Sequence, residues 1–564
     1  MSSKLVENKN KTTKDNYNPD FDFDFVIIGS GFGGSVSAMR LSQKGYRVAV
    51  IEEGKSYDNN DFPKSNWNIK KFLWIPLLRC FGIQRMTFLR RLMILHGTGV
   101  GGGSLVYANT LMQPNDEIFR SKTWPTGVDW VNELAPHFEL SKKMLGVVTN
   151  PHLAENDLVL KELSEKMGAL HTFHPTEVGV FFGQPEVEVN DPYFNGAGPR
   201  KKGCHFCGSC MIGCPTGAKN SLDKNYLYFA KKWGCKIFSE LTANKIIPPD
   251  EGQRHLRYSI TTFKSTSWFK TTGPTFTAKK VIVSGGVLGT IKLLLKNKFF
   301  YKTLPKISSR LGMDVRSNGE SLLGAVTFDR NKDFSKGISI GCAFHPDANT
   351  KIEGVRYPSG SNLLRLMGVP LTENGGIFTR PLKTFLNLIV NFPTYLRSLM
   401  IPDNAKACII LLVMQSLESK MKLSLGRSPL TLFKRNLISK REQKDLDIPS
   451  YIPVAQNAAT TLASIIDGGA YNMFSEVFFS TPMTAHILGG AIMAHTAEEG
   501  VISLNHEVFG YPGLYVSDAS VIAANLAVNP SLTITALSER FASHFPINSE
   551  RQNYTEPKIE FSNK

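Results

Sequence analysis

Two side chains near the C-terminus stand in contexts that suit acid–base chemistry. His486 precedes Ile-Leu-Gly-Gly490, and Asn529 precedes Pro-Ser-Leu-Thr533. Histidine readily accepts a proton near neutral pH, and an asparagine amide donates hydrogen bonds to oxygen atoms. A lone histidine is more often a hydrogen-bonded core residue, and it is the accompanying motif at Asn529 that favours catalysis. His96 has no such support and is interpreted as structural.

A glycine-rich run near the N-terminus has the spacing of a dinucleotide-binding turn. The run Gly29-Ser-Gly-Phe-Gly-Gly34 lies between an apolar stretch at 25–28, predicted to be a buried strand, and a predicted helix at 35–43. Gly29 would allow the tight turn, Gly31 would let the backbone approach a pyrophosphate, and Gly34 would let the helix pack close to the strand. The phosphates would lie at the helix N-terminus.

An acidic residue follows at the expected distance. A second predicted strand at 47–51 ends at Glu52, at roughly the separation of about 20 residues expected of an acid that binds a ribose hydroxyl. A glycine-rich turn in an unrelated α/β protein is the alternative, but it does not explain Glu52. The sequence therefore predicts a bound dinucleotide.

Later segments indicate that the chain leaves this nucleotide core and returns to it. A second glycine-rich run at 95–109 marks a close approach of the backbone to another group, whereas 116–199 is predicted to be irregular. Strand and helix signals return at 281–290 with 291–296, and at 513–518 with 532–540. The segment 321–474 lacks such signals and is assigned to a second, substrate-covering domain.

Length and composition limit the class of protein. The 564 residues exceed one ordinary core, so two domains are expected, and 42% hydrophobic residues are enough to fill them. Residues 1–20 are polar and lack the apolar core of a secretory signal, so they are interpreted as a flexible tail. We expect no transmembrane helix, because no uninterrupted run of about 18 apolar residues occurs. The eight cysteines suit a reducing compartment, which favours a cytoplasmic location.

The formal charge of +17 favours an anionic surface as a partner. The chain carries no recognisable nucleic-acid-binding module, so peripheral contact with a membrane explains that charge better than binding of a nucleic acid does. A solvated lysine-rich surface explains the charge as well. Segments that mix aromatic residues and leucines with basic or polar residues would suit an interfacial position, and they lie at 72–79, 86–93, 385–392 and 395–400.

Four of the eight cysteines form a run with the spacing of a bacterial ferredoxin loop. They are Cys204, Cys207, Cys210 and Cys214, followed by Pro215. Only one such run exists, and the fourth cysteine of that loop usually ligates a different cluster. A reduced or disulfide-linked structural loop without a metal is favoured, with an iron–sulfur cluster or another metal site as the alternative.

The motifs and their order resemble the glucose-methanol-choline (GMC) flavin oxidoreductases over residues 23–545. Most members of that family carry a second histidine near the C-terminus, whereas the cholesterol oxidase branch carries asparagine before Pro-x-x-Thr-Ile-Thr-Ala. Asn529 has that context here, and Gly103-Ser-Leu-Val-Tyr-Ala-Asn109 and His486-x-Leu-Gly-Gly490 are similar to the same branch.

The resemblance implies FAD as the cofactor. The implied contacts are Gly29, Gly31 and Gly34 for the diphosphate, Glu52 for the adenosine ribose, and Gly102, Gly103 and Asp518 for the isoalloxazine ring. Some family members attach FAD covalently to a histidine shortly after the second glycine-rich run. Val106 has the comparable place here, so non-covalent FAD is predicted.

The resemblance also implies a reaction: oxidation of a 3β-hydroxysterol such as cholesterol to the 3-ketosteroid, with O2 as acceptor and H2O2 as co-product. His486 would accept the hydroxyl proton and Asn529 would orient the alcohol or the flavin edge, while the flavin would take the hydride. In cholesterol oxidases a glutamate also moves the 5-ene double bond to the 4-ene position. Glu418 is a weak candidate for that base, and an exposed strand-end carboxylate is the favoured interpretation.

Two other functions stay open. One is an FAD-dependent dehydrogenase that acts on a long-chain or other lipophilic alcohol and passes electrons to an acceptor other than oxygen. The other is a catalytically silent lipid-binding or electron-transfer flavoprotein. The presence of both His486 and Asn529 argues against silence.

The predicted fold class is α/β, with a Rossmann-type FAD-binding domain and a second α+β substrate-binding domain that carries a mostly antiparallel sheet. The FAD-binding domain is assigned to 21–115, 200–320 and 475–548, the substrate-binding domain to 116–199 and 321–474, and tails to 1–20 and 549–564.

Overall fold

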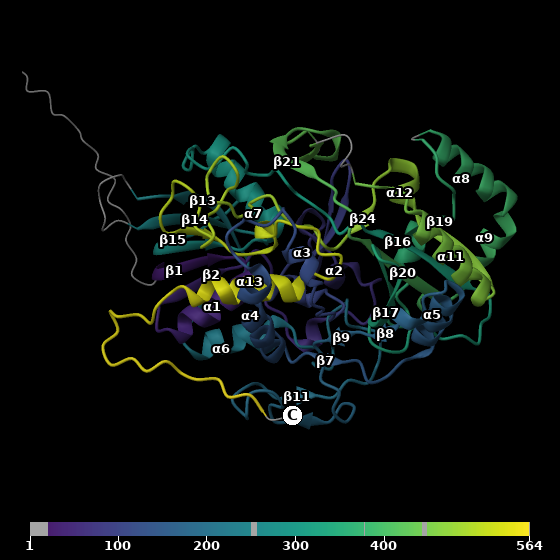
Figure 1. The fold of residues 1–564 in the computed structure, drawn as a ribbon, viewed down its shortest axis with the longest axis horizontal. Helices are drawn as coiled ribbons and strands as arrows, with labels where there is room; N and C mark the ends of the chain where they lie inside the picture. The colour runs from purple at the N-terminus through teal and green to yellow at the C-terminus, as the bar shows by residue number, and fades with distance from the viewer. Residues whose placement is uncertain (1–20, 250–256, 377, 432, 443–447, 563–564) are drawn as a thin grey trace, which may run out of the picture.

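Two seven-stranded sheets organise the chain, one in each half of the view in Figure 1. The computed structural model describes residues 21–249, 257–376, 378–431, 433–442 and 448–562. The tail predicted at 1–20 lies outside these described residues. Each sheet has its own buried apolar cluster.

The first sheet is built around parallel strands. In order across the sheet they are β12 (Lys236–Phe238), β2 (Val48–Ile51), β1 (Asp22–Ile28), β15 (Thr272–Val283) and β25 (Leu514–Val516). The antiparallel strands β14 (Tyr258–Lys264) and β13 (Leu241–Ile247) extend it from β15. β1 is buried along its whole length, as its apolar run predicts for a central parallel strand. Strands are present at the predicted positions 25–28, 47–51 and 513–518, and the strand signal at 281–290 falls on the end of β15 and the start of α7 (Gly286–Leu295). The Rossmann-type prediction is confirmed.

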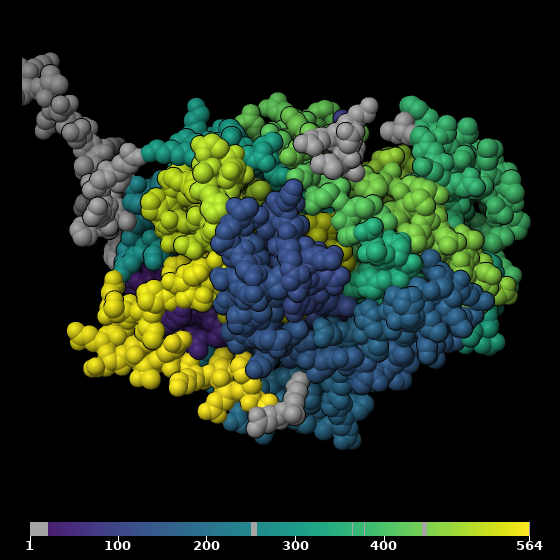
Figure 2. Space-filling view, viewed as in Figure 1, coloured from purple at the N-terminus to yellow at the C-terminus, as the bar shows by residue number. Residues whose placement is uncertain are grey.

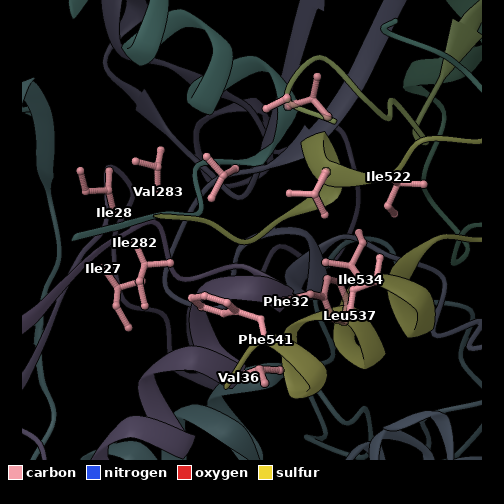
Figure 3. Close-up of a cluster of buried hydrophobic side chains, with 14 of the residues drawn as sticks. Ile27, Ile28, Phe32, Val36, Ile282, Val283, Ile522, Ile534, Leu537 and Phe541 are labelled. Carbon is pink, nitrogen blue, oxygen red and sulfur yellow. The ribbon is translucent and has the colours of Figure 1, made fainter. Parts of the chain in front are cut away.

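Helices α1 (Phe32–Gln43) and α13 (Ser531–Ser543) pack together against this sheet. Figure 3 shows Phe32 and Val36 of α1 beside Leu537 and Phe541 of α13. Gly29 has a φ of +105°, a conformation that side-chain-bearing residues rarely adopt. A Cβ on Gly34 would lie 2.0 Å from the Gly29 carbonyl oxygen, so Gly34 has the predicted role of close packing.

The second sheet is antiparallel throughout. Its order is β19 (Gly368–Pro370), β23 (Gly468–Met473), β16 (Ser321–Thr327), β20 (Cys408–Gln415), β18 (Thr350–Val355), β17 (Ile340–Asp347) and β8 (His174–Pro175). Alternate side chains face opposite sides of a strand. In β20, Ile409 and Leu411 join the core that α11 (Pro453–Ile465) covers, while Ile410 and Leu412 line a large cavity. The sheet therefore carries a helix on one face and forms a wall of the cavity with the other.

The prediction that 116–199 is irregular was wrong. This segment contains α4 (Trp130–Leu145) and α5 (Glu155–Lys166). α4 begins where the Asp129 side chain accepts a hydrogen bond from the Asn132 N–H, and it ends at Gly146 in the left-handed conformation. Pro136 within α4 interrupts the helical signal in the sequence. α4 packs against α13, on the first sheet's core, while the predicted domain boundaries stay a prediction.

Shorter elements connect these layers. They include α2 (Ile69–Phe72), α3 (Asp116–Phe119), α6 (Tyr226–Lys232), α7 (Gly286–Leu295), α10 (Asn404–Ala407), α12 (Phe474–Phe479), β5 (Gln84–Phe88), β6 (Met93–Gly97), β21 (Met421–Gly426), β22 (Asn436–Arg441) and β24 (Met483–Thr484). The segments predicted to be interfacial at 385–392 and 395–400 fall on α8 (Thr379–Val390) and α9 (Phe392–Leu399). In the described part of the chain, every helix is too short or too polar to cross a membrane.

Candidate active site

A cavity of about 850 Å³ extends from the N-terminal glycine turn to the second sheet. It brings together most of the residues that the sequence singles out, namely Gly29, Gly31, Glu52, Gly102, Gly103, His486, Asp518 and Asn529. Gly34 does not line the cavity, and its predicted contact with the diphosphate stays a prediction. Both glycine runs and both C-terminal motifs therefore meet at one site.

His486 is held by a buried carboxylate. It follows β24, and its Nδ1 forms an ion pair with the Oε1 of Glu320, which lies just before β16. Glu320 Oε2 accepts a hydrogen bond of 3.0 Å from the Ala485 N–H. Burial alone would lower the pKa of His486, but Glu320 raises that pKa above its ordinary value. With Nδ1 against Glu320, Nε2 is the ring nitrogen left to face a substrate.

Asn529 is anchored by a second buried carboxylate. Its Nδ2 donates a hydrogen bond of 3.3 Å to Glu353 Oε2, and Glu353 Oε1 lies 2.9 Å from Lys351 Nζ. Both members of this ion pair lie on β18 with side chains at most 1% exposed. Because a carboxylate only accepts hydrogen bonds, Glu353 fixes which end of the amide faces it.

At the end of the cavity near the N-terminal glycine turn, backbone atoms form much of the wall. A Cβ on Gly31 would meet no protein atom within 4 Å and would instead point into open space at the cavity wall. The Glu52 carboxylate accepts hydrogen bonds from the Ser30 hydroxyl at 2.7 Å and the Gly54 N–H at 2.8 Å. Its burial raises the pKa of Glu52. The roles of Gly31 and Glu52 in cofactor binding stay predictions.

Asp518 and the second glycine run form the middle of the cavity. Asp518 lies two residues after β25, and its carboxylate accepts hydrogen bonds from the Ser520 N–H at 2.8 Å and the Thr290 hydroxyl at 2.5 Å. Burial raises the pKa of Asp518. Gly103 would place a Cβ within 4 Å of Phe32 alone, so this wall also leaves room for a ligand.

The two weaker candidates have other partners. Glu418 pairs with the Arg316 Nε at 3.3 Å, its side chain is 38% exposed, and it does not line the cavity. It is therefore not placed to act on a substrate there. His96 lines the cavity, but its Nε2 is hydrogen-bonded to the Thr87 hydroxyl at 2.9 Å and burial lowers its pKa to about 3.

Motif reasoning missed three buried residues, Glu320, Lys351 and Glu353. None belongs to a glycine run or to the two C-terminal motifs, and they become visible only through their contacts with His486 and Asn529.

The four thiols of the cysteine run do not line this cavity, although Met211 within the run does. All four of its thiols are free, and they line a separate small cavity together with Asn109. Within the described ranges, no group of three His, Cys, Asp or Glu side chains is placed to hold a metal ion. The iron–sulfur alternative therefore gains no support from the geometry.

Family models match three parts of the chain. Residues 198–311 and 438–538 match two models described as GMC oxidoreductase, and residues 27–57 match an NAD(P)-binding Rossmann-like domain.

Several curated proteins resemble almost the whole chain. A cholesterol oxidase from Acinetobacter baumannii is 41% identical, with coverage of 95% of this chain and 97% of that protein. A cholesterol oxidase from Mycobacterium tuberculosis is also 41% identical, over 94% of this chain and 92% of its own length. A long-chain-alcohol oxidase from Arabidopsis thaliana is 24% identical over 95% of this chain and 68% of its own length.

Solved structures share the fold. A pyridoxine 4-oxidase superposes with a TM-score of 0.60 at 13% identity, over 93% of this chain and 99% of that chain. A formate oxidase from Aspergillus oryzae gives a TM-score of 0.59 at 14% identity, over 93% and 97% of the two chains. These likenesses support the architecture of the two sheets.

Proposed function

Because the chain belongs to the GMC oxidoreductase family, we propose that it is an FAD-dependent oxidase that converts a 3β-hydroxysterol such as cholesterol to the 3-ketosteroid and O2 to H2O2. The 41% identity to cholesterol oxidases supports the substrate class. The observation that carries the proposal is the convergence of His486 and Asn529, each held by a buried carboxylate, on one cavity. Composition and charge favour a cytoplasmic enzyme that contacts membranes peripherally.

The cavity fits FAD. Gly31 and Gly103 leave the space that a bound group would fill, and Glu52 and Asp518 stand at the wall as acceptors for hydroxyl or ring N–H groups. Bound FAD would supply the hydride acceptor of the reaction. Val106 at the cavity wall cannot form the histidyl link of some relatives, so we propose that FAD binds without a covalent bond.

The protein side chains supply binding and proton transfer. His486 Nε2 would accept the hydroxyl proton, and Glu320 would stabilise the imidazolium that forms. The second N–H of the Asn529 amide would hold the substrate oxygen. Apolar side chains of the second sheet, such as Ile410 and Leu412, would exclude water and hold the sterol rings. The proposal does not extend to isomerisation, since Glu418 lies outside the cavity.

Anaerobic addition of cholesterol to the purified holoenzyme, followed by admission of air, tests this proposal. We expect the visible flavin band to bleach and then to recover with release of H2O2. Bleaching without recovery would favour a dehydrogenase for a lipophilic alcohol. A band that no alcohol bleaches would contradict the proposal and favour a silent flavoprotein.

The pH dependence of turnover should show the effect of the Glu320 carboxylate on the pKa of His486. His486 accepts a proton only when neutral, so kcat/KM should fall as the pH drops through its raised pKa. The charged groups that act on His486 are Glu320 and Glu353, which raise its pKa, and Lys351, which lowers it. Glu320→Gln removes the main raising charge and leaves the burial, so the acidic limb should move down by about one pH unit or more. An unmoved limb in the pH profile of this variant would show that another group is the base.

A further inference from the structure

The four thiols of the cysteine run gather around one small cavity. Cys204, Cys207, Cys210 and Cys214 all line it, and its volume of about 10 Å³ leaves room for roughly one water molecule. Cys204 and Cys210 are 9% and 8% exposed, whereas Cys207 and Cys214 are half-buried. In Figures 1 and 2, β11 (Lys201–Lys202), which precedes the run, lies at the lower edge of the molecule. The thiols are therefore packed together close to the surface, around a space that is too small for an iron–sulfur cluster.

A buried asparagine amide lines the same small cavity. Asn109 is fully buried, and neither its amide oxygen nor its amide nitrogen has a hydrogen-bond partner among the described residues. A buried amide without a hydrogen bond is costly, and such groups are normally satisfied by protein or by a bound water molecule. The amide therefore indicates that a small polar molecule, such as water or hydrogen peroxide, belongs in this cavity.

One layer of chain separates the small cavity from the large one. Asn109 lines the small cavity, whereas Ala108 and Thr110 on either side of it line the large cavity. In the same way, Cys210 lines the small cavity and the next residue, Met211, lines the large one. Two segments, one at the end of the second glycine run and one in the cysteine run, thus form a shared wall. Hydrogen peroxide formed in the large cavity would be released next to the thiols.

Lys219 connects this wall to the thiols. Its Nζ donates hydrogen bonds to the carbonyl oxygens of Leu105 at 3.0 Å, Tyr107 at 3.1 Å and Cys210 at 2.7 Å. Burial lowers the pKa of Lys219 to about 7, and the nearby Cys210 and Cys214 act in the opposite direction. A cation beside a thiol favours the thiolate, which is the form that acts as a nucleophile. Lys219 is therefore placed both to activate a thiol and to transmit a movement of Cys210 to the wall of the large cavity.

Cys210 is the central thiol of the group. Burial raises the pKa of Cys204 and of Cys207, and among the other thiols Cys210 adds most to each rise. Because the interaction between charges weakens with distance, this order places Cys210 nearest to both. Cys204 and Cys210 also pack in one buried apolar cluster. A disulfide that begins at Cys210 therefore has Cys204 and Cys207 as its candidate partners.

We propose that the cysteine run is a peroxide-sensitive dithiol switch, in which H2O2 joins Cys210 to Cys204 or Cys207 and thereby slows turnover in the large cavity. The Cys210 thiolate attacks one peroxide oxygen, which breaks the O–O bond, gives a sulfenic acid and releases hydroxide that is protonated to water. The second thiol attacks that sulfur, forms the S–S bond and releases the sulfenic oxygen as water. Two thiols are thus oxidised to a disulfide by two electrons, while one H2O2 is reduced to two water molecules. The source of peroxide rests on the proposed function, whereas the reaction of the thiols does not.

The disulfide slows turnover by moving the shared wall. Bond formation draws two sulfur atoms from non-bonded contact to a separation of about 2 Å. Met211 and Lys219 carry that movement to the large cavity, through the lining of the wall and the hydrogen bond to the Tyr107 carbonyl. Because a displacement of about 1 Å can cost up to about 100-fold in rate, we expect kcat to fall at least about threefold on oxidation.

Thiol counting on the purified holoenzyme tests the switch without any sterol. The reduced wild type is treated with H2O2, quenched with catalase, denatured and titrated for free thiols, and its disulfides are mapped by mass spectrometry after alkylation. We expect a loss of about two thiols per chain, one disulfide that includes Cys210, and recovery of both thiols with dithiothreitol. Retention of all thiols in the run, or a disulfide that leaves out Cys210, would overturn the proposal.

Cys210→Ala is the test variant, and Cys235→Ala is its matched control. Cys235 is 6% exposed in the core of the first sheet and lines neither cavity. After peroxide treatment, Cys210→Ala should keep its thiols and its untreated kcat, whereas Cys235→Ala should lose about two thiols and slow like the wild type. Equal thiol loss in the two variants would contradict the central role of Cys210. The disulfide map of the wild type decides the question if Cys210→Ala does not fold.

Turnover separates the switch from the proposed function. Wild-type enzyme that oxidises cholesterol without catalase should lose thiols and slow down, and added catalase should prevent both changes. If cholesterol does not reduce the flavin but added H2O2 still forms the disulfide, the sterol proposal fails and the thiol chemistry stands. If cholesterol is oxidised but the disulfide form keeps the kcat of the reduced form, the switch fails and the sterol proposal stands.

Discussion

Replacement of His486 by alanine is expected to lower kcat on the order of 10²- to 10⁴-fold, the usual effect of losing a general base. His486 faces the cavity with Nδ1 paired to Glu320, so its loss removes the proton acceptor and leaves the cofactor end of the cavity intact. FAD content should therefore stay at the wild-type level. Steady-state turnover of a sterol alcohol, normalised to bound flavin, is the measurement.

A matched control for this variant lies nine residues further on, at His495→Ala. His495 is exposed, its Nε2 is hydrogen-bonded to the Thr126 carbonyl at 3.0 Å, and it does not line the cavity. Its replacement should leave kcat unchanged. If the His486→Ala variant turned over the true substrate as fast as the wild type, the assignment of His486 as the base would be wrong.

Replacement of Lys351 by methionine is expected to destabilise the protein by about 3–5 kcal/mol, the cost of leaving one member of a buried ion pair without its partner. Lys351 and Glu353 lie on β18 with side chains at most 1% exposed. The double variant Lys351→Met/Glu353→Gln removes both charges and keeps a carbonyl oxygen beside the Asn529 amide, so it should recover most of the loss. Chemical denaturation of the three proteins measures these differences.

The exposed pair between Lys332 and Glu155 provides the control for that comparison. Its Nζ–Oε1 distance of 2.8 Å is similar, but the two side chains are 42% and 38% exposed. Lys332→Met should cost about 1 kcal/mol or less, because water screens the pair. Equal effects of Lys351→Met and Lys332→Met would contradict the view that burial makes the Lys351–Glu353 pair important.

The parallel sheet and the cofactor side of the cavity could be predicted because their signals are local. The strand before Gly29, the helix after it and the acid at Glu52 follow one another within thirty-one residues, and each reflects a short-range rule of turn and packing chemistry. The base and amide candidates, His486 and Asn529, lie in recognisable motifs, so they too could be named. Both line the cavity.

The carboxylates behind these two residues could not be predicted in the same way. β18 reads Thr-Lys-Ile-Glu-Gly-Val, an alternation that predicts a strand with Lys351 and Glu353 facing water. β18 instead lies between β17 and β20 and is buried on both faces. Burial of a charged face depends on which elements cover it, and that information is not local in the sequence. Glu320 was missed for the same reason, since its partner His486 lies far along the chain.

The late position of β25 and α13 in the chain has a consequence for synthesis on the ribosome. β25 completes the parallel sheet beside β15, and Glu539 of α13 forms a buried ion pair of 2.7 Å with Arg40 of α1. The first strands and α1 therefore leave the ribosome about 500 residues before the helix that covers them, a delay of roughly half a minute or longer at about 5–20 residues per second. During that time the face of α1 that packs against α13 has no native partner, although α6 can already contact α1, so chaperone demand should be concentrated on the nascent N-terminal segment.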